Sequence, residues 1–111
     1  LQEFASHTAS SLSYGQQKLL EIIRATALGS DLLLLDEPAA GVNRTMLHHI
    51  IALIKTLKDQ GKTIIIVEHD ITFVMSLCEK IIVMDRGKEI AEGPPHEIQK
   101  NPKVLEAYLG D

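Results

Sequence analysis

Two carboxylates stand side by side at the end of a leucine-rich segment. Asp36 and Glu37 directly follow four consecutive leucines, 32–35. A buried strand that delivers adjacent carboxylates at its carboxyl end is costly unless these groups are used. Asp36 offers the hard oxygen ligand that Mg²⁺ prefers, and Glu37 could orient or deprotonate a water molecule. The alternative is that both carboxylates only cap the following turn.

A histidine follows a second apolar segment. His69 comes shortly after the apolar residues 63–67, which read as another strand. The carboxyl ends of parallel strands meet at one edge of a sheet, so we expect His69 to lie near Asp36 and Glu37. A lone histidine is usually structural, but this position favours a chemical role.

The third candidate is the start of the first helix, within Leu12-Ser13-Tyr14-Gly15-Gln16. Ser13 can cap the helix, and Gln16 completes a capping box three residues later. A helix N-terminus carries unpaired N–H groups and partial positive charge, which suits phosphate. Gly15 would let the backbone approach a ligand closely. The alternative is an ordinary capped helix.

One segment has part of the sequence pattern of a phosphate-binding loop but does not match it in full. Gly61-Lys62-Thr63 has the right ending, but Thr56 stands where the pattern requires glycine. A helix also precedes this segment and a strand follows it, which is the reverse of the required order. We predict a helix stop here, and no other Gly-Lys-Ser/Thr occurs in the chain.

Hydrophobic periodicity predicts the elements that position these residues. Apolar residues at Leu19, Ile22, Ile23 and Ala27 form one helix face, which Gly29 ends. The alternation of helices and strands predicts an α/β fold with a largely parallel sheet. The unbroken leucine run predicts a strand covered on both faces. The further segments are strands at 63–67 and 80–85, a returning strand at 88–92, and helices at 44–59, 70–77, 94–99 and 101–109.

Composition excludes several classes of protein. The 111 residues are 45% apolar and 23% charged, with a net charge of −4, which indicates one folded domain without a basic field for nucleic acid. Cys78 is the only cysteine, so no disulfide forms within the chain, and we predict that it is a small core residue. No apolar run approaches the ~18 residues of a membrane span. No signal peptide opens the chain. It begins on Leu1 rather than on methionine, so we expect that a preceding part is missing.

Taken together, these segments resemble the ABC ATPase family, from Ser11 onward. Residues 12–16 resemble the family signature, usually written LSGGQ, and 32–36 resemble the Walker B strand. Glu37 resembles the catalytic glutamate, Ala40-Gly41-Val42-Asn43 the D-loop, and His69 the switch histidine.

Two departures from the general family pattern point to one branch. Tyr14 replaces the first glycine of the signature, and Asn43 replaces the usual D-loop aspartate. Both replacements are characteristic of the ATP-binding subunits of branched-chain amino-acid importers, which this sequence resembles. Urea or amide importers and lipopolysaccharide exporters look similar.

The resemblance implies a partial P-loop NTPase fold, a mostly parallel sheet flanked by helices that lacks its N-terminal part. Residues 1–111 would be the C-terminal portion of one nucleotide-binding domain. Within it, 1–29 would hold the signature loop and helix. Residues 30–111 would hold the Walker B strand, the D-loop, the switch histidine and the C-terminal helices.

The resemblance also implies ATP and Mg²⁺ as cofactors. Glu37 and His69 would be catalytic, and Asp36 would hold the metal. The nucleotide-binding residues would be Ser13, Tyr14, Gly15, Gln16 and Asn43. In the family, the signature of one subunit closes over ATP held by the other, so the site forms across a dimer.

The implied partners are a second ATPase subunit, identical or related, and an integral-membrane permease. A periplasmic binding protein would act indirectly, nucleic acid would take no part, and the location would be the cytoplasmic face of the inner membrane. Alternatives are the related transport systems, a soluble ABC protein of translation or repair, and a noncatalytic interaction module. The 111 residues contain no loop for the α- and β-phosphates, so we predict that they are inactive alone. We also expect an incomplete sheet to expose apolar surface and cause self-association.

Overall fold

A computed structural model describes residues 13–109, which divide into two units, Leu1–His69 and Asp70–Asp111. The described part of the first unit opens with helix α1, Tyr14–Ala27. Ser13 caps this helix, and Gly29 follows it with a φ of 77°, a left-handed conformation that suits glycine. Both helix boundaries therefore lie where the sequence predicts them.

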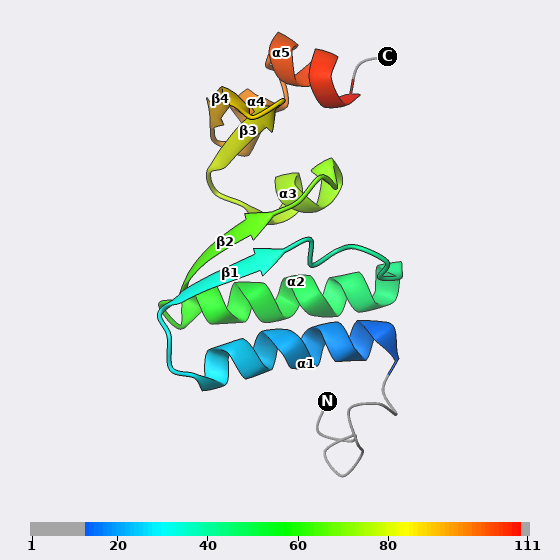
Figure 1. Ribbon diagram of the computed structural model, residues 1–111, viewed down its shortest axis with the longest axis vertical. Coiled ribbons are helices and arrows are strands. Elements are labelled where there is room, and N and C mark those ends of the chain that lie inside the picture. The colour runs from blue at the N-terminus through cyan, green and yellow to red at the C-terminus, as the bar shows by residue number, and fades with distance from the viewer. Residues whose placement is uncertain (1–12, 110–111) are drawn as a thin grey trace. The chain divides into compact units, whose positions relative to one another are not determined.

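Two parallel strands and the helix between them complete the first unit. They are β1 (Leu32–Asp36), α2 (Arg44–Asp59) and β2 (Thr63–Val67). The register pairs Leu32 with Thr63 and continues to Asp36 with Val67. The predicted parallel pair is thus confirmed, and the carboxyl ends of both strands lie at the same edge (Figure 1).

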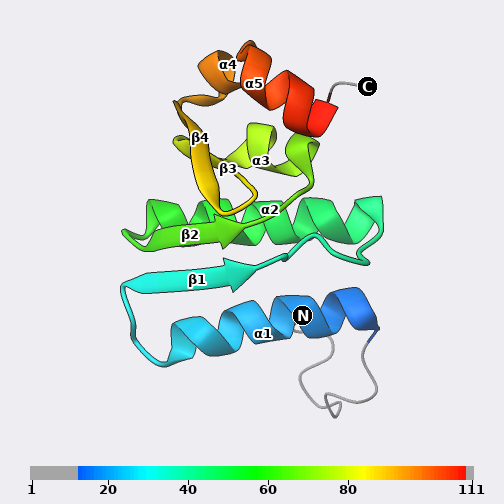
Figure 2. The same ribbon diagram turned by 45° about the horizontal axis from the view of Figure 1, so that its top comes forward.

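Helices α1 and α2 run alongside each other and pack against the strand pair (Figures 1 and 2). Side chains alternate along the strands, so one face of the pair turns toward the helices. The buried residues of this unit are Leu19, Ile22, Leu33, Ile50, Ile54 and Leu57, together with Pro38 at the strand ends. These apolar side chains form the core that holds β1 and β2 in place.

The prediction that β1 is covered on both faces is wrong for the described residues. Leu34 is 70% exposed and Val67 is 62% exposed, and Leu32 and Ile65 are about half exposed. Both helices of the unit pack on the opposite face, and the described residues supply no element for this one. The apolar surface expected of an incomplete sheet is therefore present.

The second unit begins with α3, Ile71–Leu77, and continues into a hairpin of β3 (Ile81–Asp85) and β4 (Lys88–Gly93). These strands are antiparallel, as expected of a returning strand. Arg86 and Gly87 both have positive φ, which suits a tight two-residue turn. Short helices follow as α4 (Pro95–Ile98), α5 (Pro102–Val104) and the π-helix η3 (Leu105–Leu109).

A separate small core holds the second unit together. Its buried members are Ile81, Val83, Ile98 and Val104. Cys78 packs against them, and its burial raises the pKa of the thiol, so the predicted core role of this cysteine is confirmed. Tyr108 donates a hydrogen bond to the carbonyl of Met84, which ties the π-helix to β3. Among residues 13–109, no helix has the length and apolar character to cross a membrane.

Candidate functional site

The strand ends bring Glu37 and His69 together. The Glu37 N–H donates to the Val67 carbonyl at 2.7 Å, which continues the parallel ladder beyond β1. His69 Nδ1 lies 2.8 Å from Glu37 Oε1, a distance at which a protonated Nδ1 donates to the carboxylate. The side chains are 72% and 49% exposed, so both can be reached by a ligand.

Glu37 has an unusual backbone. Its φ is 48°, in the left-handed region that non-glycine residues rarely occupy. The Glu37 carbonyl accepts hydrogen bonds from the Ala40 N–H and from Lys18 Nζ, each at 3.1 Å. Strained conformations of this kind cluster at functional sites. The turn after β1 is therefore held in a conformation that presents the Glu37 carboxylate to His69.

Asp36 lies apart from this pair. It shares its strand face with Leu32 and Leu34, the exposed face of β1. Among the described residues, the acidic and histidine side chains whose ligand atoms lie within 4.8 Å of one another are Glu37, Glu68 and His69. Successive side chains along an extended backbone point to opposite sides, so the adjacent carboxylates of Asp36 and Glu37 face different ways. An exposed carboxylate at a strand end has the oxygen donors that Mg²⁺ prefers, so Asp36 still fits the metal.

Glu68 is a member of the site that sequence reasoning overlooked. Its side chain is 1% exposed and accepts hydrogen bonds from the backbone N–H groups of Ala39 and His69, each at 3.0 Å. Strand alternation could have revealed it, since Glu68 continues the inward face of Ile64 and Ile66. An acidic residue at an inward position is a signal that it has specific partners.

The start of α1 has the predicted capping box. The Gln16 N–H donates to Ser13 Oγ at 3.2 Å, and the Ser13 N–H donates to Gln16 Oε1 at 2.9 Å. Ser13 is exposed, so the positive end of the helix faces solvent rather than the core. The geometry is compatible with both earlier interpretations, a phosphate site and an ordinary cap.

Gly15 and Tyr14 have a packing role in addition. A Cβ atom on Gly15 would lie 2.3 Å from the Met46 Cγ, and one on Gly41 would lie 3.2 Å from the Tyr14 ring. Lys18 Nζ lies 5.6 Å from the centre of the same ring. The start of α1 thus packs closely against the first turn of α2 and the turn that precedes it. A side chain at position 15 would force Met46 to move, whether or not a ligand approaches.

Asn43 caps α2. Its side-chain oxygen accepts a hydrogen bond from the Met46 N–H at 2.8 Å. This bond accounts for an amide or carboxylate at position 43, since either side chain can cap a helix. A contact between Asn43 and a partner subunit stays a prediction.

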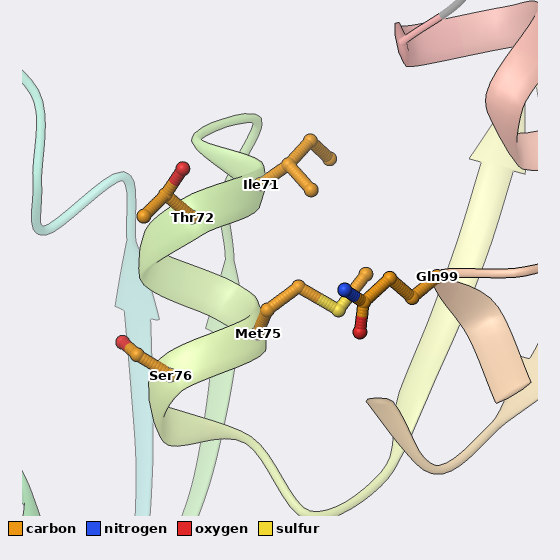
Figure 3. A pocket seen from close by; sticks show the side chains of 5 residues that line it. All are labelled: Ile71, Thr72, Met75, Ser76 and Gln99. Atoms are coloured by element: carbon orange, nitrogen blue, oxygen red, sulfur yellow. The ribbon is translucent and has the colours of Figure 1, made fainter. Parts of the chain in front are cut away.

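A second candidate lies within the second unit. A depression of about 460 Å³ lies between α3 and the end of α4. Figure 3 shows Met75 and Gln99 approaching each other there. Its lining residues are Ile71, Thr72, Met75, Ser76 and Gln99. None of them is charged, so this depression contains no carboxylate or histidine that could act as an acid or base. The strand-end cluster is the better candidate.

Comparison with known proteins agrees with the motifs. Residues 1–40 match the family described as "ABC transporter", and residues 88–111 match "Branched-chain amino acid ATP-binding cassette transporter". The chain is 43% identical over its whole length to the high-affinity branched-chain amino acid transport ATP-binding protein BraF of Pseudomonas aeruginosa. The chain belongs to the ABC transporter family and corresponds to part of an ATP-binding cassette.

Other cassettes of this family show the same relationship. LivG of Escherichia coli, named as a branched-chain amino acid transport ATP-binding protein, is 41% identical over the whole chain. LptB of Acidithiobacillus ferridurans, named for lipopolysaccharide export, is 37% identical over 91% of it. The chain spans only 44% of BraF and LivG and 42% of LptB.

The structure also resembles solved cassettes. A crystal structure of an ATP-binding cassette of an ABC transporter in its ADP conformation aligns with a TM-score of 0.85 at 37% identity, over 95% of this chain and 43% of that one. A nucleotide-free cassette aligns with a TM-score of 0.84 at 36% identity, over the same shares of the two chains. The predicted fold, a part of the ABC ATPase cassette, is confirmed.

Proposed function

We propose that this chain forms part of an ATP-hydrolysing subunit that drives the import of branched-chain amino acids. The observation that carries this proposal is the 2.8 Å contact between His69 Nδ1 and Glu37 Oε1 at the shared edge of two parallel strands. A carboxylate held by an imidazole in the open can orient a water molecule beside a phosphoryl group. The similarity to BraF and LivG supports the choice of solute.

Each residue has a defined task in this proposal. Glu37 orients the attacking water, and His69 holds the Glu37 carboxylate and stabilises charge that develops on the terminal phosphate. Asp36 would hold Mg²⁺, and the bound ion would neutralise charge on the phosphate oxygens. These tasks follow the separation seen in the structure, with Asp36 on one strand face and the Glu37–His69 pair beyond the strand ends.

The start of α1 serves a nucleotide held by a second ATPase subunit. Ser13, Tyr14, Gly15 and Gln16 present an exposed helix end, whose N–H groups and partial positive charge suit a phosphate. Asn43 caps α2 beside it and touches the partner subunit. The complete protein would act with a membrane permease at the cytoplasmic face of the membrane, and a periplasmic binding protein would deliver the solute.

Lipopolysaccharide export is the second candidate function. LptB is 37% identical, so the ATPase chemistry would be the same. Import is favoured by the greater identity to BraF and by the branched-chain family match at residues 88–111. Uptake of labelled leucine by vesicles that carry the assembled transporter distinguishes the two, because an exporter of lipopolysaccharide would take up none.

Replacement of Glu37 tests the ATPase proposal. In the complete protein, Glu37→Gln should lower kcat for ATP hydrolysis by about 10²- to 10⁴-fold, the usual contribution of a positioned acid or base. ATP binding should persist, because the amide has the size of the carboxylate. The matched control is Glu21→Gln, an exposed position on α1. Equal turnover in Glu37→Gln and wild type would show that Glu37 has no role in the reaction.

A further inference from the structure

A buried carboxylate lies beside the exposed pair of the site. The Glu68 side chain is 1% exposed, whereas those of Glu37 and His69 are 49% and 72% exposed. A carboxylate taken out of water is costly unless hydrogen bonds replace its hydration. The partners of Glu68 therefore show what its position achieves.

Each oxygen of Glu68 accepts a backbone hydrogen bond. Oε2 accepts from the Ala39 N–H and Oε1 accepts from the His69 N–H, both at 3.0 Å. The ring Nδ1 of His69 lies 3.6 Å from Oε1, so the imidazole also lies next to this carboxylate.

These two bonds join the segments that carry the reacting pair. Ala39 belongs to the turn that starts at Glu37, where φ is 48° and the backbone is strained. His69 follows Glu68 directly in the chain. One buried carboxylate thus binds the turn that aims Glu37 and the backbone that aims His69, across 29 residues of sequence.

We propose that Glu68 is a positioning residue, which sets the approach of His69 to Glu37 by holding the backbone N–H groups of Ala39 and His69. Its kinetic consequence rests on the proposed ATPase function, and its geometric consequence does not. Glu68 itself contacts no reacting atom in this proposal. It acts only through the placement of the other two residues.

Substitution with glutamine isolates this role. Glu68→Gln preserves the shape of the side chain, but an amide offers only one oxygen acceptor. One of the two backbone N–H groups then faces an N–H donor and loses its partner. The matched control is Glu21→Gln, which makes the same chemical change at an exposed position. Glu68→Asp retains both oxygens on a shorter arm and serves as a second variant.

Two measurements on the complete protein decide the matter. Crystal structures of wild type and Glu68→Gln should show that the 2.8 Å contact between Glu37 Oε1 and His69 Nδ1 is lost in the variant. Steady-state kinetics should show a fall in kcat of about 10- to 100-fold, as for a misplacement near 1 Å, with little change in KM for ATP. Glu68→Asp should recover part of kcat, and Glu21→Gln should behave as wild type.

The outcomes separate the two proposals. An intact Glu37–His69 contact in Glu68→Gln would overturn the positioning role, whatever the kinetics show. If the complete wild-type protein hydrolyses no ATP, the proposed function fails, and the crystal structures still decide the role of Glu68. If thermal melts show that Glu68→Gln does not fold, the same two measurements on Glu68→Asp take its place. Equal kcat and contact distance in Glu68→Asp and wild type would then reject the role.

Discussion

At the scale of single residues, two features with a chemical interpretation also have a packing interpretation. Gly15 lies in a helix start that suits a phosphate, but a Cβ there would also collide with the Met46 Cγ at 2.3 Å. Gln16 could meet a nucleotide, but its side chain already accepts from the Ser13 N–H. A residue type in a motif can therefore satisfy two requirements, and only substitution separates them.

The substitution Gly15→Ala tests the packing requirement at this position. Alanine normally stabilises a helix by roughly 0.5–1 kcal/mol relative to glycine, whereas overpacking costs about 1–3 kcal/mol. Because the Met46 side chain is in the way, we expect a net loss in the free energy of unfolding, measured by urea denaturation of the complete protein. In a Met46→Ala background the same change should be neutral or stabilising. Equal effects in both backgrounds would show that the collision with Met46 is not the reason for glycine.

At the scale of secondary structure, the caps place the site loops. Ser13, Asn43 and Asp70 cap α1, α2 and α3 through side-chain bonds to backbone N–H groups. In the first unit, the turn that carries Glu37 lies between β1 and the cap of α2. A helix that frays at this cap would loosen the segment against which Tyr14 and Gly15 pack.

Asn43→Ala tests the cap of α2. Removal of the side-chain oxygen that binds the Met46 N–H should cost about 1 kcal/mol in the free energy of unfolding. Asn43→Asp is the matched control, because it keeps an acceptor and adds a negative charge that the helix N-terminus favours. Chemical denaturation of the complete protein measures both. A loss in Asn43→Asp as large as in Asn43→Ala would contradict the capping role.

At the scale of the molecule, the most prominent feature is the uncovered face of β1 and β2. Leu32, Leu34, Ile65 and Val67 lie on this face of the first unit and are each about half exposed or more. Contiguous apolar surface of this kind promotes association, and strands at a sheet edge add unpaired backbone groups. The 111 residues taken by themselves should therefore associate in solution.

Positively charged side chains on the uncovered face of β1 and β2 should weaken this self-association. We expect the isolated 111-residue chain to show a multimeric mass in light scattering, and the double variant Leu34→Lys/Ile65→Lys to move it toward the monomer. Leu28→Lys is the matched control, because Leu28 is 86% exposed but lies at the end of α1. A monomeric mass for the wild-type chain would contradict the prediction, as would an equal shift for Leu28→Lys.

The positions of the elements and the order of the motifs could be read from the chain, because capping boxes, glycine stops and apolar periodicity act over a few residues. The sequence also predicted that Glu37 and His69 lie at the same edge of the sheet, because the carboxyl ends of parallel strands meet there. Two features needed the tertiary structure: which face of β1 stays open, and the bonds of Glu68 to the N–H groups of Ala39 and His69. Each depends on which segments meet in space, such as Ala39 with Glu68 across 29 residues, and short-range patterns contain no record of such meetings.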